Sequence, residues 1–206
     1  MKTSNPSPMP SRDDLALARR TFQDREARDV FYRAASELVD LSLRRLTSSL
    51  STAEALAILL KTWNVTYYRF HKRFGPSHFA EIENLLERHG ALLAAWRARE
   101  IESLSPKDEE PAMRLFSDFE AVLGPVGAAK ALHLLMPSFC PLWDRAIAKA
   151  YGLSLRPSGQ NAPRYWRLMA ITREQACSLR SQGESRPDLL KGLDEYNYCR
   201  FTNKWM

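Results

Sequence analysis

Apolar side chains recur at intervals of three and four residues along most of this 206-residue chain, and this spacing limits the possible folds more than any other feature of the sequence. It is the period of an amphipathic α-helix. The sequence contains no run of alternating apolar and polar residues, no turn pair typical of a β-hairpin and no internal repeat. We therefore expect an all-α fold, built as a single compact orthogonal array of helices.

Capping and breaking residues set the bounds of the expected helices. Residues 13–45 suit one or two helices, and Ser51 forms a capping box with Glu54 that opens the next. This helix should continue to about His71, and Gly90 should interrupt the helix after it. The helices predicted beyond residue 45 span residues 51–71, 77–90, 92–101, 107–123, 126–136, 144–151, 164–180 and 188–201.

Length and composition indicate one domain. An apolar content of 45% is enough to build one core in a chain of 206 residues. Residues 1–11 are rich in Ser and Pro and should form a disordered tail, which leaves residues 12–206 as the domain. Because the sequence has neither a membrane-spanning apolar run nor the apolar stretch of a secretory signal, it predicts a cytoplasmic protein with no membrane association.

Several kinds of site have no support in the sequence. Cys140, Cys177 and Cys199 are odd in number and lack CxxC spacing or paired histidines, so we expect reduced, mostly buried thiols and no zinc site. Motifs of phosphate-binding loops, dinucleotide-binding domains and nucleophile elbows are also missing. The sequence thus predicts no metal and no cofactor, and it gives no indication of the oligomeric state.

The charge distribution is compatible with an anionic partner. The chain carries a formal charge of +6 with a pI near 9.4. Residues 145–180 contain seven Lys and Arg against the single acid Glu174, and residues 61–73 contain Lys and Arg without any acid. Such clusters either bind an anion or are ordinary solvated surface, and composition alone does not separate these two interpretations.

The most informative segment runs from Leu123 to Gly152. A helix should end at Leu123, a tight turn of Gly124, Pro125, Val126 and Gly127 should follow, and a second helix should begin at once. Small residues in such a turn let the backbone approach a phosphate, and the N–H groups that begin the second helix point at that anion. The alternative is an ordinary helical hairpin in which Gly and Pro only end one helix and start another.

This segment resembles the helix-hairpin-helix superfamily of base-excision DNA glycosylases, and most of all its 8-oxoguanine DNA glycosylase-like fold, over about 30 residues. The matching residues are Leu123, Gly124, Pro125, Val126 and Gly127 in the hairpin, Ala131 at a small position four residues later, and Pro141, Leu142, Trp143 and Asp144 in the following loop. Gly and Pro are exchanged relative to the family pattern, the loop has one additional residue, and the path to Asp144 is shorter.

The resemblance implies a set of functional residues. Asp144 would be the catalytic carboxylate. DNA backbone contacts would come from Gly124, Val126, Gly127, Ala128, Lys130, Arg145 and Lys149. Bifunctional members carry a Schiff-base lysine two positions after the last hairpin glycine, where this chain has Ala129. Lys130 lies one step further, about 100° around the helix, so we expect it to face away from Asp144 and the mechanism to be monofunctional.

A base pocket would need aromatic and polar walls, since the target base must leave the DNA stack. Candidates are Trp63, Asn64, Tyr67, Tyr68, His133 and Trp143, and the C-terminal residues Tyr198 and Phe201 could also contribute. Each group has a structural alternative. One helical stripe contains Trp63, Tyr67 and Phe70, which could belong to the core. His133 could be a hydrogen-bonded, partly buried histidine. Asp144 could be the N-cap of a helix.

Three functions are compatible with the sequence. The first is a monofunctional DNA glycosylase that excises a modified base in base excision repair. The second is a DNA-binding module of the same fold without catalytic activity. The third is a helical scaffold or small-molecule-binding protein with no nucleic-acid role. This alternative stays open because a resemblance in fold does not determine a function.

Overall fold

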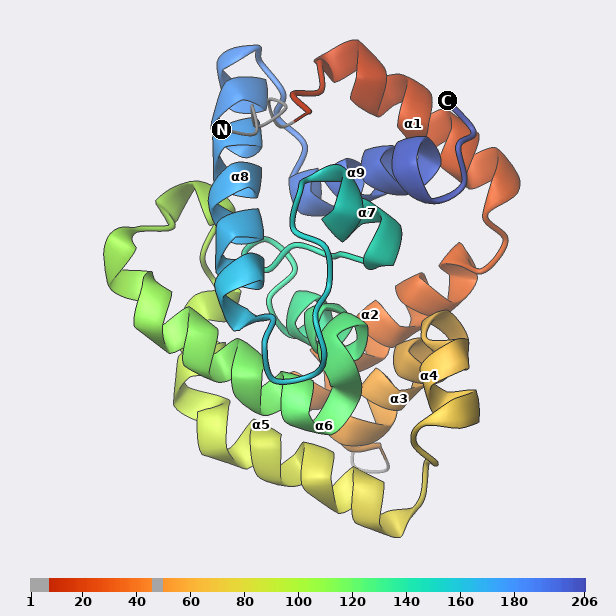
Figure 1. Cartoon of the computed structure of the whole chain (residues 1–206), viewed down its shortest axis with the longest axis vertical. Helices are drawn as coiled ribbons and strands as arrows, with labels where there is room; N and C mark the ends of the chain where they lie inside the picture. Colours follow the sequence, from red (N-terminus) through yellow and green to blue (C-terminus); the bar gives the residue numbers. More distant parts are fainter. Residues whose placement is uncertain (1–7, 46–49) are drawn as a thin grey trace.

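The computed structural model describes residues 8–45 and 50–206, and Figure 1 shows their arrangement. Helices account for the secondary structure of these residues, which include no strand, so the all-α prediction is confirmed. The orthogonal arrangement remains a prediction. The helices are α1 (Arg12–Arg25), α2 (Asp29–Leu43), α3 (Thr52–Trp63), α4 (Val65–Phe70), α5 (Pro76–Arg97), α6 (Glu109–Leu135), α7 (Arg145–Ala150), α8 (Ala162–Ser181) and α9 (Leu189–Asn197), with short turns η1 (Ile101–Ser103), η2 (Pro106–Asp108) and η3 (Tyr198–Thr202).

Helix α6 is the central element. Every residue from Gly127 to Leu135 is buried, and α6 contacts α2, α3, α5 and α8. The backbone of Gly124 leaves the helical conformation with φ 70° and ψ 168°, which divides α6 into residues 109–123 and 125–135. Pro125 begins the second section, where its missing N–H has no intrahelical partner to lose. The kink turns the second section into the core.

The other helices pack around this section in pairs. In Figure 1, α8 stands at the left beside α6, and α5 runs below α6. Helices α2 and α3 lie against each other at the lower right, and α9 packs against α1 at the upper right. None of the helices in the described ranges has the length and hydropathy needed to cross a membrane.

Two helix bounds differ from the expectation. The helix predicted over residues 51–71 begins with the expected Ser51 capping box but breaks at Asn64 (φ −125°, ψ 38°), which separates α3 from α4. Gly90 does not interrupt α5, because Ile82 and Leu93 on either side of it keep the same buried stripe. A glycine inside a helix costs about 1 kcal/mol relative to alanine, and packing outweighs this cost.

The N-terminal residues and the cysteines also depart in part from expectation. Of the tail predicted over residues 1–11, residues 1–7 lie outside the described ranges. Pro8 accepts a hydrogen bond from Gln175 at 2.5 Å, and Ser11 caps α1 through a capping box, so residues 8–11 are joined to the domain. Cys140 and Cys199 are buried free thiols as expected, whereas Cys177 is exposed.

Candidate functional site

A cavity of about 630 Å³ lies beside the α6 kink. This volume falls within the range of small-molecule pockets. Six parts of the chain line it: the connection between α1 and α2, the end of α3 with α4, the kink and second section of α6, the start of α7, the loop after α7, and the C-terminal α9 with η3. The lining residues used below are Trp63, Asn64, Tyr67, Gly124, Pro125, Val126, Lys130, Trp143, Asp144, Arg145, Asp194, Tyr198 and Thr202, with Glu26, Arg28 and His71.

The two glycines of the predicted hairpin allow α3 and α4 to close on α6. A Cβ at Gly124 would lie 2.8 Å from Cε2 of Tyr67, and the positive φ of this residue also favours glycine. A Cβ at Gly127 would lie 3.1 Å from Nδ2 of Asn64. Internal packing therefore accounts for both glycines without a phosphate. Among residues 124–128, only Pro125 and Val126 are partly exposed.

Lys130 is buried at the cavity, which corrects the expected geometry. Its side chain is 8% exposed, its Nζ donates a hydrogen bond to the backbone carbonyl of Trp63, and it lies 5.9 Å from the Trp63 ring centroid. Burial lowers the pKa of Lys130 to about 8, although Asp144 and Asp194 oppose this shift. We expected Lys130 to face away from Asp144, but helix geometry counted from Gly127 misses the kink three residues earlier, and both residues line one cavity.

Ala129, the residue at the position of the family lysine, is fully buried in the core and does not line the cavity. The chain therefore presents an amine to the site from the neighbouring position. Because Lys130 is buried, it cannot be one of the surface contacts to a DNA backbone that the resemblance implied.

Asp144 is both an N-cap and a residue of the cavity wall. Its Oδ1 accepts a hydrogen bond from the backbone N–H of Ile147 at 2.8 Å, so the N-cap interpretation is confirmed. Its Oδ2 accepts a hydrogen bond from the hydroxyl of Thr202 at 2.6 Å. These two bonds fix the orientation of the carboxylate and connect α7 to the C-terminal turn η3.

Asp194 is a second carboxyl group at the cavity, and sequence reasoning missed it. It lies on α9, it is 7% exposed, and no hydrogen bond to its side chain is found within the described residues. Burial raises the pKa of Asp194 to about 7; Lys191 and Lys130 oppose this shift, and Glu195 and Asp144 add to it. The sequence signal was an acidic pair, Asp194 and Glu195, in the helix that we predicted over residues 188–201.

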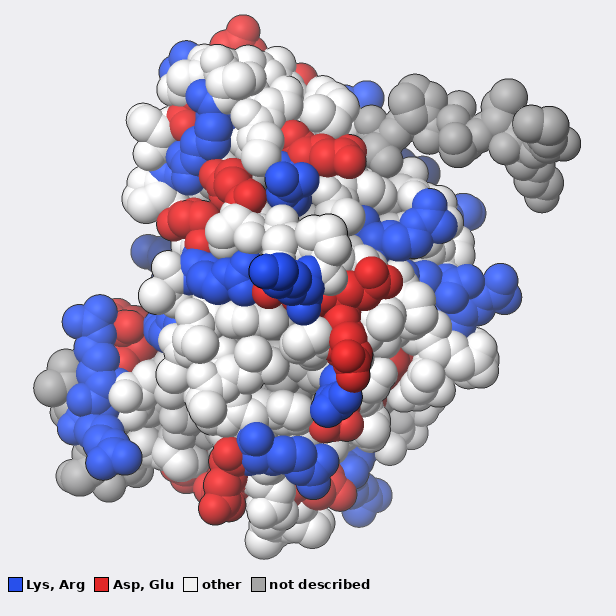
Figure 2. All heavy atoms as spheres, turned by 90° about the vertical axis from the view of Figure 1, so that its left-hand side faces the viewer, with Lys and Arg blue, Asp and Glu red and all other residues white. Residues whose placement is uncertain are grey.

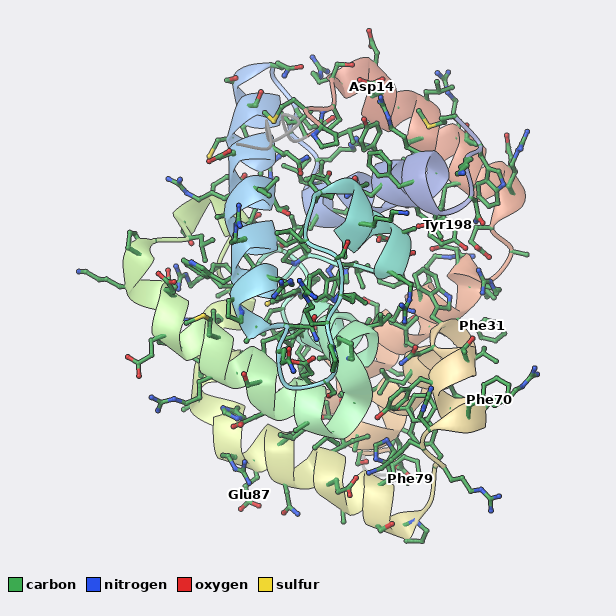
Figure 3. All side chains as sticks on the ribbon, viewed as in Figure 1. Asp14, Phe31, Phe70, Phe79, Glu87 and Tyr198 are labelled. Atoms are coloured by element: carbon green, nitrogen blue, oxygen red, sulfur yellow. The ribbon has the colours of Figure 1, made fainter. Side chains whose placement is uncertain are left out.

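Three aromatic residues stand in the cavity wall. Trp63 donates a hydrogen bond through Nε1 to the carbonyl of Arg28 at 3.0 Å, and Tyr67 covers Gly124. Tyr198 donates a hydrogen bond to Glu26 at 2.5 Å and accepts one from Arg28 at 2.6 Å. Figure 3 shows Tyr198 beside the end of α9. The sequence had named Trp63 and Tyr67 for the pocket and Tyr198 as a possible contributor.

Other predicted pocket residues lie elsewhere. Tyr68 is buried against Phe74 and hydrogen-bonds to His78 at 3.2 Å, because the break at Asn64 rotates α4 relative to α3. His133 is fully buried between the hydroxyl of Tyr32 at 2.9 Å and the carbonyl of Cys140 at 2.8 Å. Burial lowers the pKa of His133 to about 4. The alternative of a hydrogen-bonded buried histidine is therefore confirmed.

Trp143 lines the cavity but offers no open ring face. It is 1% exposed, it packs edge-to-face with Phe116 and Tyr165, and it donates a hydrogen bond to the carbonyl of Pro125 at 3.0 Å. Phe70, assigned to a core stripe with Trp63 and Tyr67, is 70% exposed because the helix breaks at Asn64.

Among the expected DNA contacts, Gly124, Val126 and Arg145 line the cavity. Gly127 and Ala128 are buried under α3, and Lys149 is exposed away from the cavity lining. The larger basic cluster includes α8, on the left-hand side of Figure 1. Figure 2 shows that Lys and Arg on that face are intermingled with Asp and Glu. Arg180 of this cluster pairs with Glu102 at 2.9 Å. This face is a mixed solvated surface rather than a basic patch.

The cavity thus combines the buried amine of Lys130, the carboxyl groups of Asp144 and Asp194, a third carboxyl group, Glu26, that is paired with Arg28, and aromatic side chains. No group of three or more His, Cys, Asp and Glu side chains in residues 8–45 and 50–206 is placed to hold a metal ion. Comparison of the chain with protein-family models, with curated proteins and with solved structures found no match.

Proposed function

We propose that the cavity at the α6 kink receives a nucleobase turned out of a DNA strand, and that the protein cleaves the N-glycosidic bond of a modified base. One observation carries this proposal: Asp144 and the buried amine of Lys130 face a single cavity that has Trp63 and Tyr67 in its wall. Aromatic faces stack on an extruded base, and charged groups beside them act on the sugar.

Asp144 would act on the sugar. Breaking the N-glycosidic bond develops positive charge on C1′ and the ring oxygen of the sugar. A carboxylate whose orientation is fixed in advance stabilises this charge without having to reorganise. The hydrogen bonds from Ile147 and Thr202 provide such fixation. In this role Asp144 also orients the water that attacks C1′.

Lys130 adds a second nucleophile, which changes the mechanism expected from the sequence. Burial lowers its pKa to about 8, so an unprotonated amine is accessible near neutral pH. Attack of Nζ on C1′ would form a C–N bond while the base leaves with the electrons of the broken bond. After ring opening and loss of a proton the sugar would be held as an imine, which borohydride reduces to a stable amine.

DNA would be held mainly by the rim of the cavity. Arg28 and Arg145 are exposed there and can meet phosphates, and Pro125 and Val126 can approach the strand. Because Gly127 and Ala128 are buried, the hairpin backbone takes a smaller part than the family resemblance implied. The activity requires a compartment that contains DNA, in agreement with the cytoplasm expected from the sequence.

The test is base release from labelled duplexes that each carry one deaminated, oxidised or alkylated base, with abasic sites revealed by alkali. Wild type should release at least one of these bases. Asp144→Asn should lower the rate by about 100-fold or more, since asparagine preserves the cap but not the charge. Asp24→Asn, a change of an exposed residue on α1, is the matched control and should leave the rate unchanged. Absence of release from every duplex would exclude the glycosylase.

Borohydride distinguishes the two nucleophiles in the same assay. A covalent protein–DNA product that is absent in Lys130→Met assigns the attack to Lys130, and release without such a product assigns it to water.

A second candidate function, a binder of a free nucleobase or another small molecule, is favoured by the internal packing that accounts for Gly124 and Gly127. Binding of DNA that weakens with salt supports the first candidate, because phosphate contacts release counterions.

A further inference from the structure

The carboxyl group of Asp194 differs from those of Asp144 and Glu195 in its hydrogen bonding. The other carboxylates around it have partners: Thr202 and Ile147 hold Asp144, and Lys191 donates a hydrogen bond to Glu195 at 3.0 Å. Asp194 is almost as buried as Glu195, yet no hydrogen bond to its side chain is found in the described residues, and it lines the cavity. Oε2 of Glu195 is among the fully buried oxygens without a hydrogen-bond partner in the described residues and the oxygens of Asp194 are not, so the carboxyl group of Asp194 borders the cavity, where it can form a hydrogen bond with a ligand.

Charged and titratable groups face Asp194 from each neighbouring element. They are Lys191 and Glu195 on α9, Lys130 on α6, Asp144 at the start of α7, and Tyr32 and Asp29 on α2. Nζ of Lys191 forms ion pairs with Oε1 of Glu195 at 3.0 Å and with Oδ1 of Asp29 at 3.3 Å. Neither lysine forms an ion pair with Asp194 in residues 8–45 and 50–206, and the effect of burial on the pKa of Asp194 outweighs the opposing attraction of Lys191.

These surroundings favour the protonated form of Asp194 near neutral pH, since burial raises its pKa to about 7. A carboxylic acid that keeps its proton at this pH can donate it to a substrate. Tyr198, one helical turn further along the C-terminal helix, also lines the cavity, so an aromatic ring and an acid reach it from the same element.

We propose that Asp194 is the acid that donates a proton to the departing base. This inference rests on the proposed glycosylase function and adds its leaving-group step. The O–H bond of Asp194 breaks as its proton passes to a ring nitrogen or carbonyl oxygen of the base, and the base takes the electrons of the C1′–N bond. When the nucleophile is water, its oxygen bonds to C1′ and its proton restores the acid. One water is consumed for each base released.

The sharpest test compares two leaving groups. A neutral purine needs a proton in order to leave, whereas 7-methylguanine already carries a positive charge in DNA and needs none. Asp194→Asn should slow single-turnover release of the neutral base by about 100-fold or more, the effect typical of a lost general acid. It should change release of 7-methylguanine by less than about threefold. Equal losses on both substrates, or no loss on either, would overturn the proposal.

The pH dependence of the rate of base release is a second test of the role of Asp194. Wild-type release of the neutral base should fall about tenfold per pH unit above about pH 7, and release of the cationic base should not follow this slope. Asp188→Asn is the matched control: Asp188 precedes α9, pairs with Arg19 at 3.0 Å and is not part of the cavity lining. It should leave both rates unchanged. A wild-type profile that is flat for the neutral base would contradict the assignment.

Binding separates this inference from the proposed function. Free adenine should quench tryptophan fluorescence through Trp63, with an affinity that falls above about pH 7 in wild type and stays constant in Asp194→Asn. If this pH dependence is found but no DNA base is released, Asp194 donates to a bound base and the glycosylase proposal fails. If bases are released but neither assay responds to Asp194→Asn, the glycosylase proposal stands and the assignment of Asp194 fails.

Discussion

Two lysines, Lys130 and Lys191, are more than nine-tenths buried, and their surroundings differ in almost every respect. Lys191 pairs with Glu195 and Asp29 and lies over the ring of Phe22 at 4.0 Å. Burial alone would lower its pKa, but the attraction of Asp194, Glu195 and Asp29 outweighs it and raises the pKa. Lys130 has a backbone carbonyl as its hydrogen-bond acceptor and no ion pair in the described ranges, and its pKa falls to about 8.

The comparison teaches how to separate a buried charge that serves the fold from one that is available for function. Removing a buried cation that has carboxylate partners leaves those carboxylates unpaired and destabilises the fold, whereas a buried cation without such partners lowers stability and is available for chemistry. The same contrast holds for the acids of α9, since Glu195 has Lys191 as partner and Asp194 has none in the described structure. Four substitutions test this distinction.

The largest effect should come from Lys191→Met. Removing this cation leaves Glu195 and Asp29 as buried carboxylates without their partner, and breaking a buried ion pair in this way typically costs about 3 to 5 kcal/mol. Urea unfolding at pH 7, followed by circular dichroism, should show a loss of this size. A loss below about 1 kcal/mol would mean that Lys191 is not the structural lysine of the pair.

Asp194→Asn should act in the opposite direction. Because the pKa of Asp194 is raised from 3.8 to about 7, the folded state holds a proton that the unfolded state releases between these values. Wild type therefore loses stability as pH rises from about 4 to 7, and the variant does not. At pH 8 the variant should be more stable by about 4 kcal/mol. Unfolding free energies that differ equally at pH 4 and pH 8 would contradict this expectation.

Lys130→Met should also stabilise the protein, by a smaller amount. Lowering the pKa from 10.5 to about 8 corresponds to a cost of about 3 kcal/mol at pH 7, and loss of the hydrogen bond to Trp63 offsets about 1 kcal/mol. The cost is present below pH 8 and disappears as pH rises toward 10.5, so the difference from wild type should shrink over this window. A destabilised variant would make Lys130 a structural lysine like Lys191.

The sequence predicted the helices better than the cavity. Apolar spacing predicted the helical class, and capping residues such as Ser51 located the helix starts, because both depend on neighbours along the chain. Trp63, Tyr67 and Asp144 were named for a pocket and do line one cavity. Tyr68 was placed wrongly, because the break at Asn64 depends on contacts between distant segments. Of the two interpretations of His133, the hydrogen-bonded buried histidine is confirmed, and its bond to Tyr32 joins segments far apart in sequence.

Lys130 and Asp194 show the limit of local reasoning most clearly. The direction of the Lys130 side chain depends on the kink at Gly124, which lies outside the helical turn that contains Lys130. Asp194 joins the cavity because α9 packs against α1 and the following turn η3 packs against α7, which are contacts between residues far apart in sequence. Neither feature is encoded in a motif, and both concern the groups that we propose carry the chemistry.

Among Lys191, Asp194, Lys130 and Asp144, the smallest effect on stability should come from Asp144. Its substitutions sharpen the comparison because they separate the effect of the carboxylate charge from that of capping α7. Asparagine caps a helix about as well as aspartate, so Asp144→Asn should change the free energy of unfolding by less than about 0.5 kcal/mol, whereas Asp144→Ala should cost about 1 kcal/mol. Because Asp144 raises the pKa of Lys130, the asparagine variant should also lower the pKa of that amine further. Its titration, followed by NMR of a protein labelled at the lysine side chains, should move to lower pH in Asp144→Asn and stay unchanged in Asp24→Asn. An unmoved Lys130 resonance would mean that Asp144 only caps α7 and does not act on the cavity that the two residues share.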